Sequence, residues 1–102
     1  MTANPERGEA RLLVGGESLT LRPSFEALVA AEEELGPLFA LVERAAEGAL
    51  KLSEMAALFW HCVQDRPETV THERIGAAIA EAGLAAMTPV LKRLLTQILQ
   101  GR

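Results

Sequence analysis

The chain has 102 residues, of which 49% are hydrophobic and 24% charged, and its formal net charge at pH 7 is −4. This length predicts one domain with a single modest core, and the composition excludes disordered, collagen-like and disulfide-rich proteins. The acidic balance argues against nucleic acid as a main partner, because phosphate binding needs a field of Lys and Arg side chains. Aromatic residues make up only 4% of the chain, so the core must be mainly aliphatic, which is typical of packed helices.

The sequence carries no sign of export or membrane insertion. Its one cysteine, Cys62, cannot form an internal disulfide, which fits a reducing compartment. Residues 1–7 contain no apolar run, so they do not form a secretory signal and are predicted to be a flexible polar arm. No stretch approaches the ~20 apolar residues that a membrane span requires. We therefore expect a cytoplasmic protein that binds no membrane, with a single domain over residues 8–100.

Two short runs with alternating apolar residues, 10–14 and 18–22, flank the pair Gly15-Gly16. This pattern predicts a β-hairpin, because glycine accepts the positive φ angles of a tight hairpin turn. The apolar residues of the two runs share one face: Leu12, Val14, Leu19 and Leu21. Since a lone hairpin is marginally stable in water, that face must rest on helices.

Two helices are predicted to follow. The first begins after Ser24, whose hydroxyl can cap it, and ends at Gly36. Its expected inward stripe is Phe25, Leu28, Val29 and Leu35. The second helix covers residues 37–48, and its expected inward side chains are Leu38, Leu41, Val42 and Ala45.

Three more helices complete the predicted fold. The third begins after a Ser53 cap, extends to about Gln64 and is apolar nearly all round, which is typical of a central helix or of one pressed against a second chain. The fourth covers residues 71–83 and is capped by Thr71. Thr88-Pro89 marks the start of the fifth, since proline is tolerated in a first turn, and a helix from Leu84 that is kinked at Pro89 is the alternative. The predicted class is α+β, mostly α: an N-terminal β-hairpin followed by about five short helices in one compact domain.

No residue pattern predicts catalysis, a cofactor or a metal. The spacings between the three candidate ligands match no known metal motif: His61, Cys62 and His72. His61 and Cys62 are neighbours on a helix, so their side chains point about 100° apart. The sequence has no nucleophile elbow and no Gly-rich phosphate loop. The acidic run Glu32-Glu33-Glu34 is of a kind that usually forms a solvated helix face. We therefore expect no enzymatic activity.

Glu32 is unusual because it lies seven residues after Phe25, on the apolar stripe of its helix. One interpretation is that its stem covers the edge of the core while its carboxylate reaches water or pairs with Arg11 or Arg22. The other interpretation is a specific polar contact at an interface.

The apolar faces of the third and fifth helices are wider than one core contact needs. Trp60, beside Phe59, is the residue type that most often anchors an interface, although a place at the flank of the core is an equal alternative. The candidate partner-binding residues are Phe59, Trp60, Met87, Leu91, Leu94, Ile98 and Glu32. The alternative for the whole set is a well-filled five-helix core without a partner.

Several short motifs carry a resemblance to a known family. They are Arg7-Gly8-Glu9, Leu19-x-Leu21-Arg22, Phe25-Glu26-Ala27-Leu28 and Glu32-Glu33-Glu34-Leu35-Gly36. In this order, with a short helix ending at Gly48 after them, the chain resembles the small tail proteins of phage-like clusters in alphaproteobacteria, best known from gene transfer agents. The resemblance covers roughly residues 7–99, and Glu32 and Gly36 stand where the family typically has Glu and Gly. The chain departs from the family at Pro23-Ser24, where a Thr cap is more common, and at Val29-Ala30-Ala31, which is less polar than usual.

The resemblance implies one of two roles, because family descriptions name either tail tube proteins or tail assembly chaperones. A tube subunit should be rich in β-structure, whereas this sequence predicts one short hairpin and has few β-branched residues. An assembly chaperone needs apolar helical faces for a long helical client, which the resemblance implies is the tape-measure protein. We therefore expect a non-enzymatic tail assembly chaperone. The alternatives are a structural tail tube component kept in the phage-like particle, and a generic helical adaptor or dimerisation module that forms a homo-oligomer.

Overall fold

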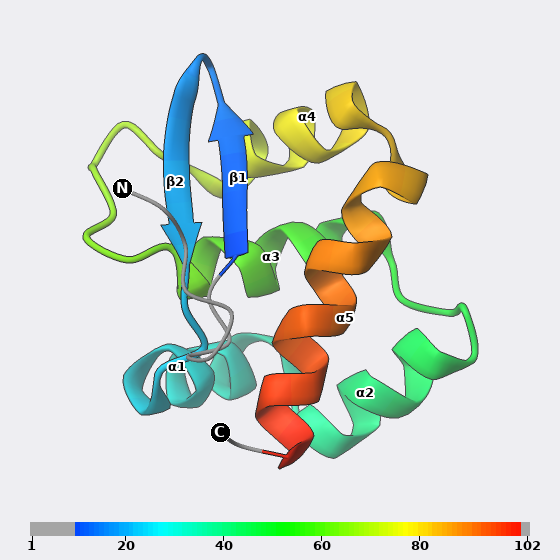
Figure 1. Cartoon of the computed structure of the whole chain (residues 1–102). Coiled ribbons are helices and arrows are strands. Elements are labelled where there is room, and N and C mark those ends of the chain that lie inside the picture. Colours follow the sequence, from blue (N-terminus) through cyan, green and yellow to red (C-terminus); the bar gives the residue numbers. More distant parts are fainter. Residues whose placement is uncertain (1–9, 101–102) are drawn as a thin grey trace.

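In the computed structural model, residues 10–100 form one β-hairpin and then five helices (Figure 1). The structure describes residues 10–100, so the predicted arm at residues 1–7 lies outside the described residues. The elements are β1 (Ala10–Val14), β2 (Glu17–Leu21), α1 (Phe25–Leu35), α2 (Leu38–Ala46), α3 (Leu52–Cys62), α4 (His72–Ala82) and α5 (Leu84–Gln100). This order confirms the predicted mostly helical α+β class.

The hairpin has the turn and the buried face that the sequence predicts. β1 and β2 pair antiparallel, and the two turn residues Gly15 and Gly16 have φ angles of 56° and 87°. Positive φ at both positions matches the twist of the strands and requires glycine or a similarly permissive residue. The four apolar side chains on the inner face are each at most 7% exposed: Leu12, Val14, Leu19 and Leu21.

β2 also pairs with the chain that follows α3. The Arg22 N–H donates to the Cys62 carbonyl at 2.7 Å, and the Gln64 N–H donates to the Thr20 carbonyl at 2.8 Å. Between these two bonds, Val63 forms a bridge with the fully buried Leu21. Because Val63 is extended to make this bridge, α3 ends at Cys62 rather than near Gln64 as predicted.

α3 crosses the middle of the molecule and forms the centre of the core (Figure 1). α1, α4 and β2 all pack against it. Its buried side chains are Met55, Ala56, Ala57, Leu58, Phe59 and Cys62. The prediction of a central helix is therefore confirmed. Burial raises the pKa of the Cys62 thiol to about 12, so this cysteine stays protonated and unreactive in the folded protein. None of the helices within residues 10–100 is long and apolar enough to cross a membrane.

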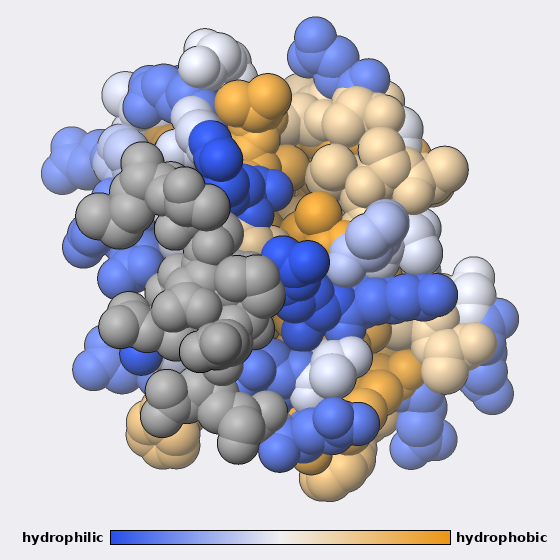
Figure 2. Space-filling view, in the orientation of Figure 1, coloured by the Kyte–Doolittle hydropathy of each residue, from blue (hydrophilic) through white to orange (hydrophobic). Residues whose placement is uncertain are grey.

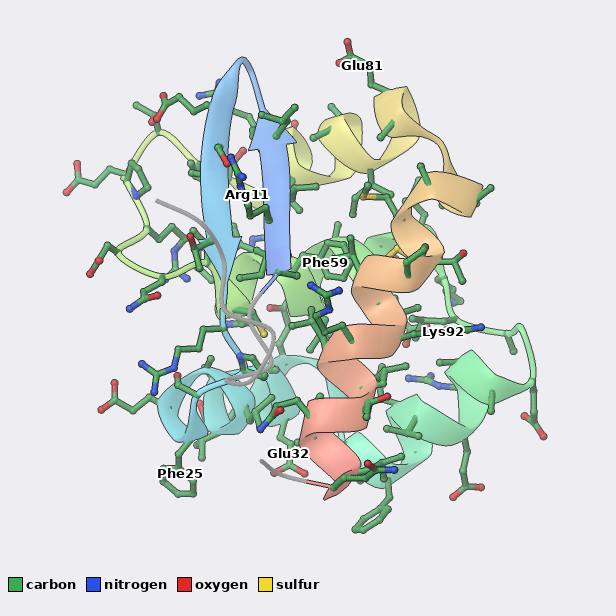
Figure 3. All side chains as sticks on the ribbon, in the orientation of Figure 1. Arg11, Phe25, Glu32, Phe59, Glu81 and Lys92 are labelled. Atoms are coloured by element: carbon green, nitrogen blue, oxygen red, sulfur yellow. The ribbon has the colours of Figure 1, made fainter. Side chains whose placement is uncertain are left out.

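The inward face of α1 differs from the predicted stripe. Phe25 is 82% exposed and points away from the molecule, in contrast to the buried Phe59 (Figure 3). Ala31 is the buried residue of α1, and Ala27 and Leu35 on the same face pack against the core. α1 thus meets the core through two alanines and Leu35, spaced four residues apart. Phe25 and Val29 are turned toward solvent.

Two helix starts also differ from the prediction. α3 begins at Leu52, and its preceding residue Lys51 donates its N–H to the Glu54 carboxylate at 3.0 Å, so Ser53 lies inside the first turn. α5 begins at Leu84, which was the alternative to the predicted start at Thr88-Pro89. Pro89 therefore lies within the helix. The Met87 N–H donates to the Gly83 carbonyl, and Gly83 is the single residue between the end of α4 and the start of α5.

Two phenylalanines offer a direct test of where the core lies. Phe59→Ala should lower the free energy of unfolding by about 3–5 kcal/mol, because it removes a fully buried ring and leaves a cavity. Phe39→Ala is the matched control, since this ring is 76% exposed and its loss should change the free energy by less than about 0.5 kcal/mol. Urea unfolding followed by circular dichroism measures both. Equal effects of the two substitutions would contradict the assigned core.

Candidate partner-binding surface

Three of the predicted partner-binding residues belong to the core. Phe59 and Leu94 are fully buried and Leu91 is 8% exposed, so a partner has nothing to contact at these positions. The two leucines lie on the side of α5 that packs against β1 and α4. The width of the apolar faces on α3 and α5 thus reflects contacts with several elements of this chain, as the alternative of a well-filled core anticipates.

A first apolar hollow lies between α2 and the end of α5, with a volume of about 180 Å³. Phe39 and Leu99 at its border are 76% and 52% exposed, which is high for side chains of this size. The residues that line the hollow are Glu32, Leu38, Phe39, Val42, Ile98 and Leu99. Figure 2 shows apolar atoms at the foot of the molecule, where α2 and the end of α5 lie.

Glu32 closes this hollow on the side of α1 and fixes the start of α2. Its carboxylate accepts a hydrogen bond from the Leu38 N–H at 3.0 Å. The residue before α2 is Pro37, which offers no side-chain cap, so Glu32 performs that task from the preceding helix. Gly36 lets the chain turn between the two helices with φ of 89°. Glu32 is therefore exposed, as one interpretation expected, and a backbone N–H rather than Arg11 or Arg22 is its hydrogen-bond partner.

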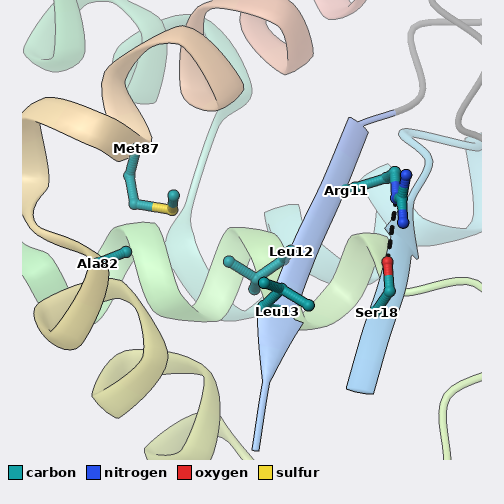
Figure 4. Close-up of a pocket in the computed structure, with 6 residues that line it drawn as sticks. All are labelled: Arg11, Leu12, Leu13, Ser18, Ala82 and Met87. Carbon is teal, nitrogen blue, oxygen red and sulfur yellow. Dashed lines mark hydrogen bonds between the residues drawn. The ribbon is translucent and has the colours of Figure 1, made fainter. Parts of the chain in front are cut away.

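A second hollow lies between β1 and the start of α5, with a volume of about 390 Å³ (Figure 4). Met87, one of the predicted partner-binding residues, lines it together with Ala82 at the end of α4. Leu13 is 68% exposed because it points away from the buried face of the hairpin. Arg11 donates to the Ser18 hydroxyl at 3.0 Å across the strands and gives the hollow a polar border.

The two hollows lie near opposite ends of α5, at Met87 and at Ile98. Eleven helical residues separate these positions, which corresponds to about 16 Å along the helix axis. We call the two hollows together the α5 surface. It contains Met87, Ile98 and Glu32 from the sequence-based set. Phe39 was not among the predicted partner-binding residues. Its position off the inward stripe of α2 does indicate an exposed aromatic side chain.

Trp60 lies outside both hollows, in a polar cluster. Its indole N–H donates to the Val70 carbonyl at 2.9 Å, and the Arg66 guanidinium covers its ring with the central carbon 3.5 Å from the ring centre. The imidazole of His72 packs against the same ring at 4.3 Å between centroids. Trp60 is thus held by its own chain at the flank of the core, which was the alternative to an interface anchor.

Glu34 joins two histidines in this cluster. One oxygen of its carboxylate lies 2.6 Å from His61 Nε2 and 3.0 Å from His72 Nε2. These side chains come from α1, α3 and α4, so no local spacing in the sequence indicates the cluster. The hydrogen bond from His72, followed by that from His61, lowers the pKa of Glu34 below its ordinary value of 4.5, although partial burial opposes the shift.

Comparison with known families identifies one match. A family model described as phage tail tube protein, GTA-gp10, matches residues 7–101. The match includes every element of the fold described above, both hollows and the polar cluster. No curated protein and no solved structure shows significant similarity to the chain.

The contribution of Glu34 to stability should depend on pH. Because the pKa of Glu34 is lower in the folded protein, its contribution is present above pH 4.5 and disappears as the pH falls through the folded-state value. We expect Glu34→Gln to lower the free energy of unfolding by about 0.5–1 kcal/mol at pH 6–7, since the carboxylate is largely exposed, and to have no effect well below pH 4.5. Urea unfolding of both proteins measures this change in the free energy of unfolding, with a chelator present to remove metal ions.

The neighbouring substitution Glu33→Gln is the control for this experiment, because it removes one exposed carboxylate from the same turn of α1. A pH-independent effect of Glu34→Gln, or an equal effect of both substitutions, would contradict the assigned hydrogen bonds between the Glu34 carboxylate and the two histidines.

Proposed function

The chain belongs to the family of phage tail proteins described as phage tail tube protein, GTA-gp10, and we propose that it is an assembly chaperone that binds another tail protein before the tail is built. The observation that carries the proposal is the α5 surface, where large apolar side chains remain exposed around two hollows. The proposal assigns no enzymatic step to the chain and places its action in the cytoplasm.

The exposed apolar side chains favour a protein partner. Covering a side chain such as Phe39 or Leu99 contributes roughly 1.5–3 kcal/mol when it passes from full exposure to full burial. An aromatic residue that can enter or border a hollow is typical of the centre of a protein interface. The polar borders supplied by Glu32 and Arg11 fit the rim of such an interface.

The shape of the α5 surface favours a helical partner. Met87 and Ile98, which each line one hollow, lie about 16 Å apart along α5, and this matches the span of an amphipathic helix of about eleven residues, whose apolar side chains recur every three to four positions. The proposed client is the tape-measure protein of the tail, because a long helical protein exposes such stripes until it is enclosed. Binding along α5 would cover these stripes before the tube forms around them.

A structural role in the tail tube is the second candidate, and the description of the family favours it. Against it stands the small amount of sheet, since the described residues contain one two-stranded sheet with strands of five residues. A ring of tube subunits with a β-structured wall would need more strand than this hairpin supplies.

A second copy of the chain is the other occupant of the α5 surface that the experiments must distinguish. The mass of the isolated chain in solution shows whether the chain forms such a dimer.

Co-expression with the tape-measure protein of the same tail cluster tests the proposal. The two proteins should copurify as a soluble complex, and Phe39→Ser should weaken their affinity at least about tenfold, because it removes the most exposed apolar side chain of the hollow. Phe25→Ser is the matched control: its ring is 82% exposed but lies outside both hollows. Calorimetric titration of the purified partners measures the affinities.

Circular dichroism should show that both variants fold like the unchanged protein, since neither ring is buried. Absence of a complex, or equal affinities for the Phe39 and Phe25 variants, would contradict the assignment of the α5 surface.

A further inference from the structure

Three potential metal ligands converge on one point at the surface, outside the α5 surface. Glu34 near the end of α1, His61 near the end of α3 and His72 at the start of α4 each offer a ligand atom, and these atoms lie within 4.8 Å of one another. Two imidazoles and one carboxylate are a ligand set typical of zinc and related divalent transition metals. The fold alone brings them together, which is why their sequence spacing suggested no metal.

The surrounding residues hold the two imidazoles in place. Trp60 packs against both rings, at 4.9 Å from His61 and 4.3 Å from His72, and its indole is itself fixed by the bond to Val70. His72 is the first residue of α4, whose start is fixed by the Thr71 hydroxyl accepting the Arg74 N–H. Ligands positioned by rigid elements and by neighbouring side chains need little reorganisation when a metal binds.

The distances are close to those that a metal requires. Ligand atoms bound to Zn²⁺ at about 2.0–2.1 Å in a tetrahedron are roughly 3.3 Å apart. The Glu34 oxygen is now 2.6 Å and 3.0 Å from the two Nε2 atoms, so it must move away from each by less than about 1 Å. The three ligand atoms lie within 4.8 Å of one another, so a pair at that limit must approach by about 1.5 Å. Glu34 and His72 can make this movement, because their side chains are about 40% exposed.

We propose that Glu34, His61 and His72 bind a divalent transition metal ion, with Zn²⁺ as the best fit. The metal takes the place of hydrogens between the two Nε2 atoms and Glu34. Each imidazole then coordinates as the neutral ring through Nε2, with its single proton on Nδ1, and any proton in excess of that is released to water. Water completes the coordination on the side of the apolar groove of about 560 Å³ between α3 and α4, which Glu34 and His72 border. The ion would tie α1, α3 and α4 together at one point.

The composition of the chain makes this proposal easy to test. The chain has two histidines and one cysteine. Both histidines are in the cluster, and Cys62 is buried in the core with its thiol protonated. Imidazole coordination by the untagged chain therefore reports on this site alone.

The experiment is titration of the full, untagged chain with ZnCl₂ in a calorimeter, and with CoCl₂ followed by visible absorption. We expect one ion per chain with a Kd in the micromolar range or below, and d–d absorption typical of cobalt with nitrogen and oxygen ligands. A hundredfold excess of Zn²⁺ over its Kd should raise the Tm by roughly 10 °C or more. The affinity should fall in acid, because protons compete for both imidazoles.

His72→Gln and Glu34→Gln should each weaken binding at least about tenfold, because each removes one ligand. Neither side chain is part of the core, and each is about 40% exposed, so neither variant should fail to fold. Glu33→Gln, in the same acidic run but outside the cluster, should bind like the unchanged chain. No binding up to about millimolar Zn²⁺, or equal binding by His72→Gln and the unchanged chain, would overturn the proposal.

Discussion

The burial of α3 on nearly all sides is the constraint on which the rest of the structure depends. Phe59, Leu58 and Cys62 are almost completely shielded because α1, α4 and the hairpin each press on a different face of this helix. The chain that leaves α3 then pairs with β2, so the hairpin is fixed by backbone hydrogen bonds as well as by its apolar face. A two-stranded hairpin that is marginal alone becomes part of the core in this way.

The same constraint explains where the apolar surface lies. α2 and the end of α5 are joined to the remainder by fewer buried side chains, with Leu41 and Leu94 as the fully buried ones. Phe39 and Leu99 therefore stay exposed beside a hollow that Glu32 borders. The proposed partner-binding role rests on this division: α3 forms the centre of the core, and the elements at its edge present apolar side chains that their own chain does not cover.

Sequence patterns predicted the elements better than the surfaces. The Gly15-Gly16 turn and the Ser24 and Thr71 caps are local chemistry, and all three are confirmed. The predicted inward stripe of α1 was wrong at Phe25 and Val29, which are exposed, whereas its Leu35 does pack against the core. Periodicity does not reveal which of two apolar stripes faces the core, and here the stripe with Ala31 does. The cluster of Glu34, His61 and His72 was beyond local patterns, since it joins three helices through tertiary contacts.

The most direct test of the assembly role is the copy number of this protein in mature particles relative to the soluble fraction of the same cells. Quantitative mass spectrometry of both fractions, from cells that express the whole tail cluster, provides this ratio. Our account predicts that the protein occurs in the soluble fraction together with a long helical tail protein and is essentially absent from purified particles. A fixed, stoichiometric number of copies in the particle would contradict the account and identify the protein as a structural component of the tail.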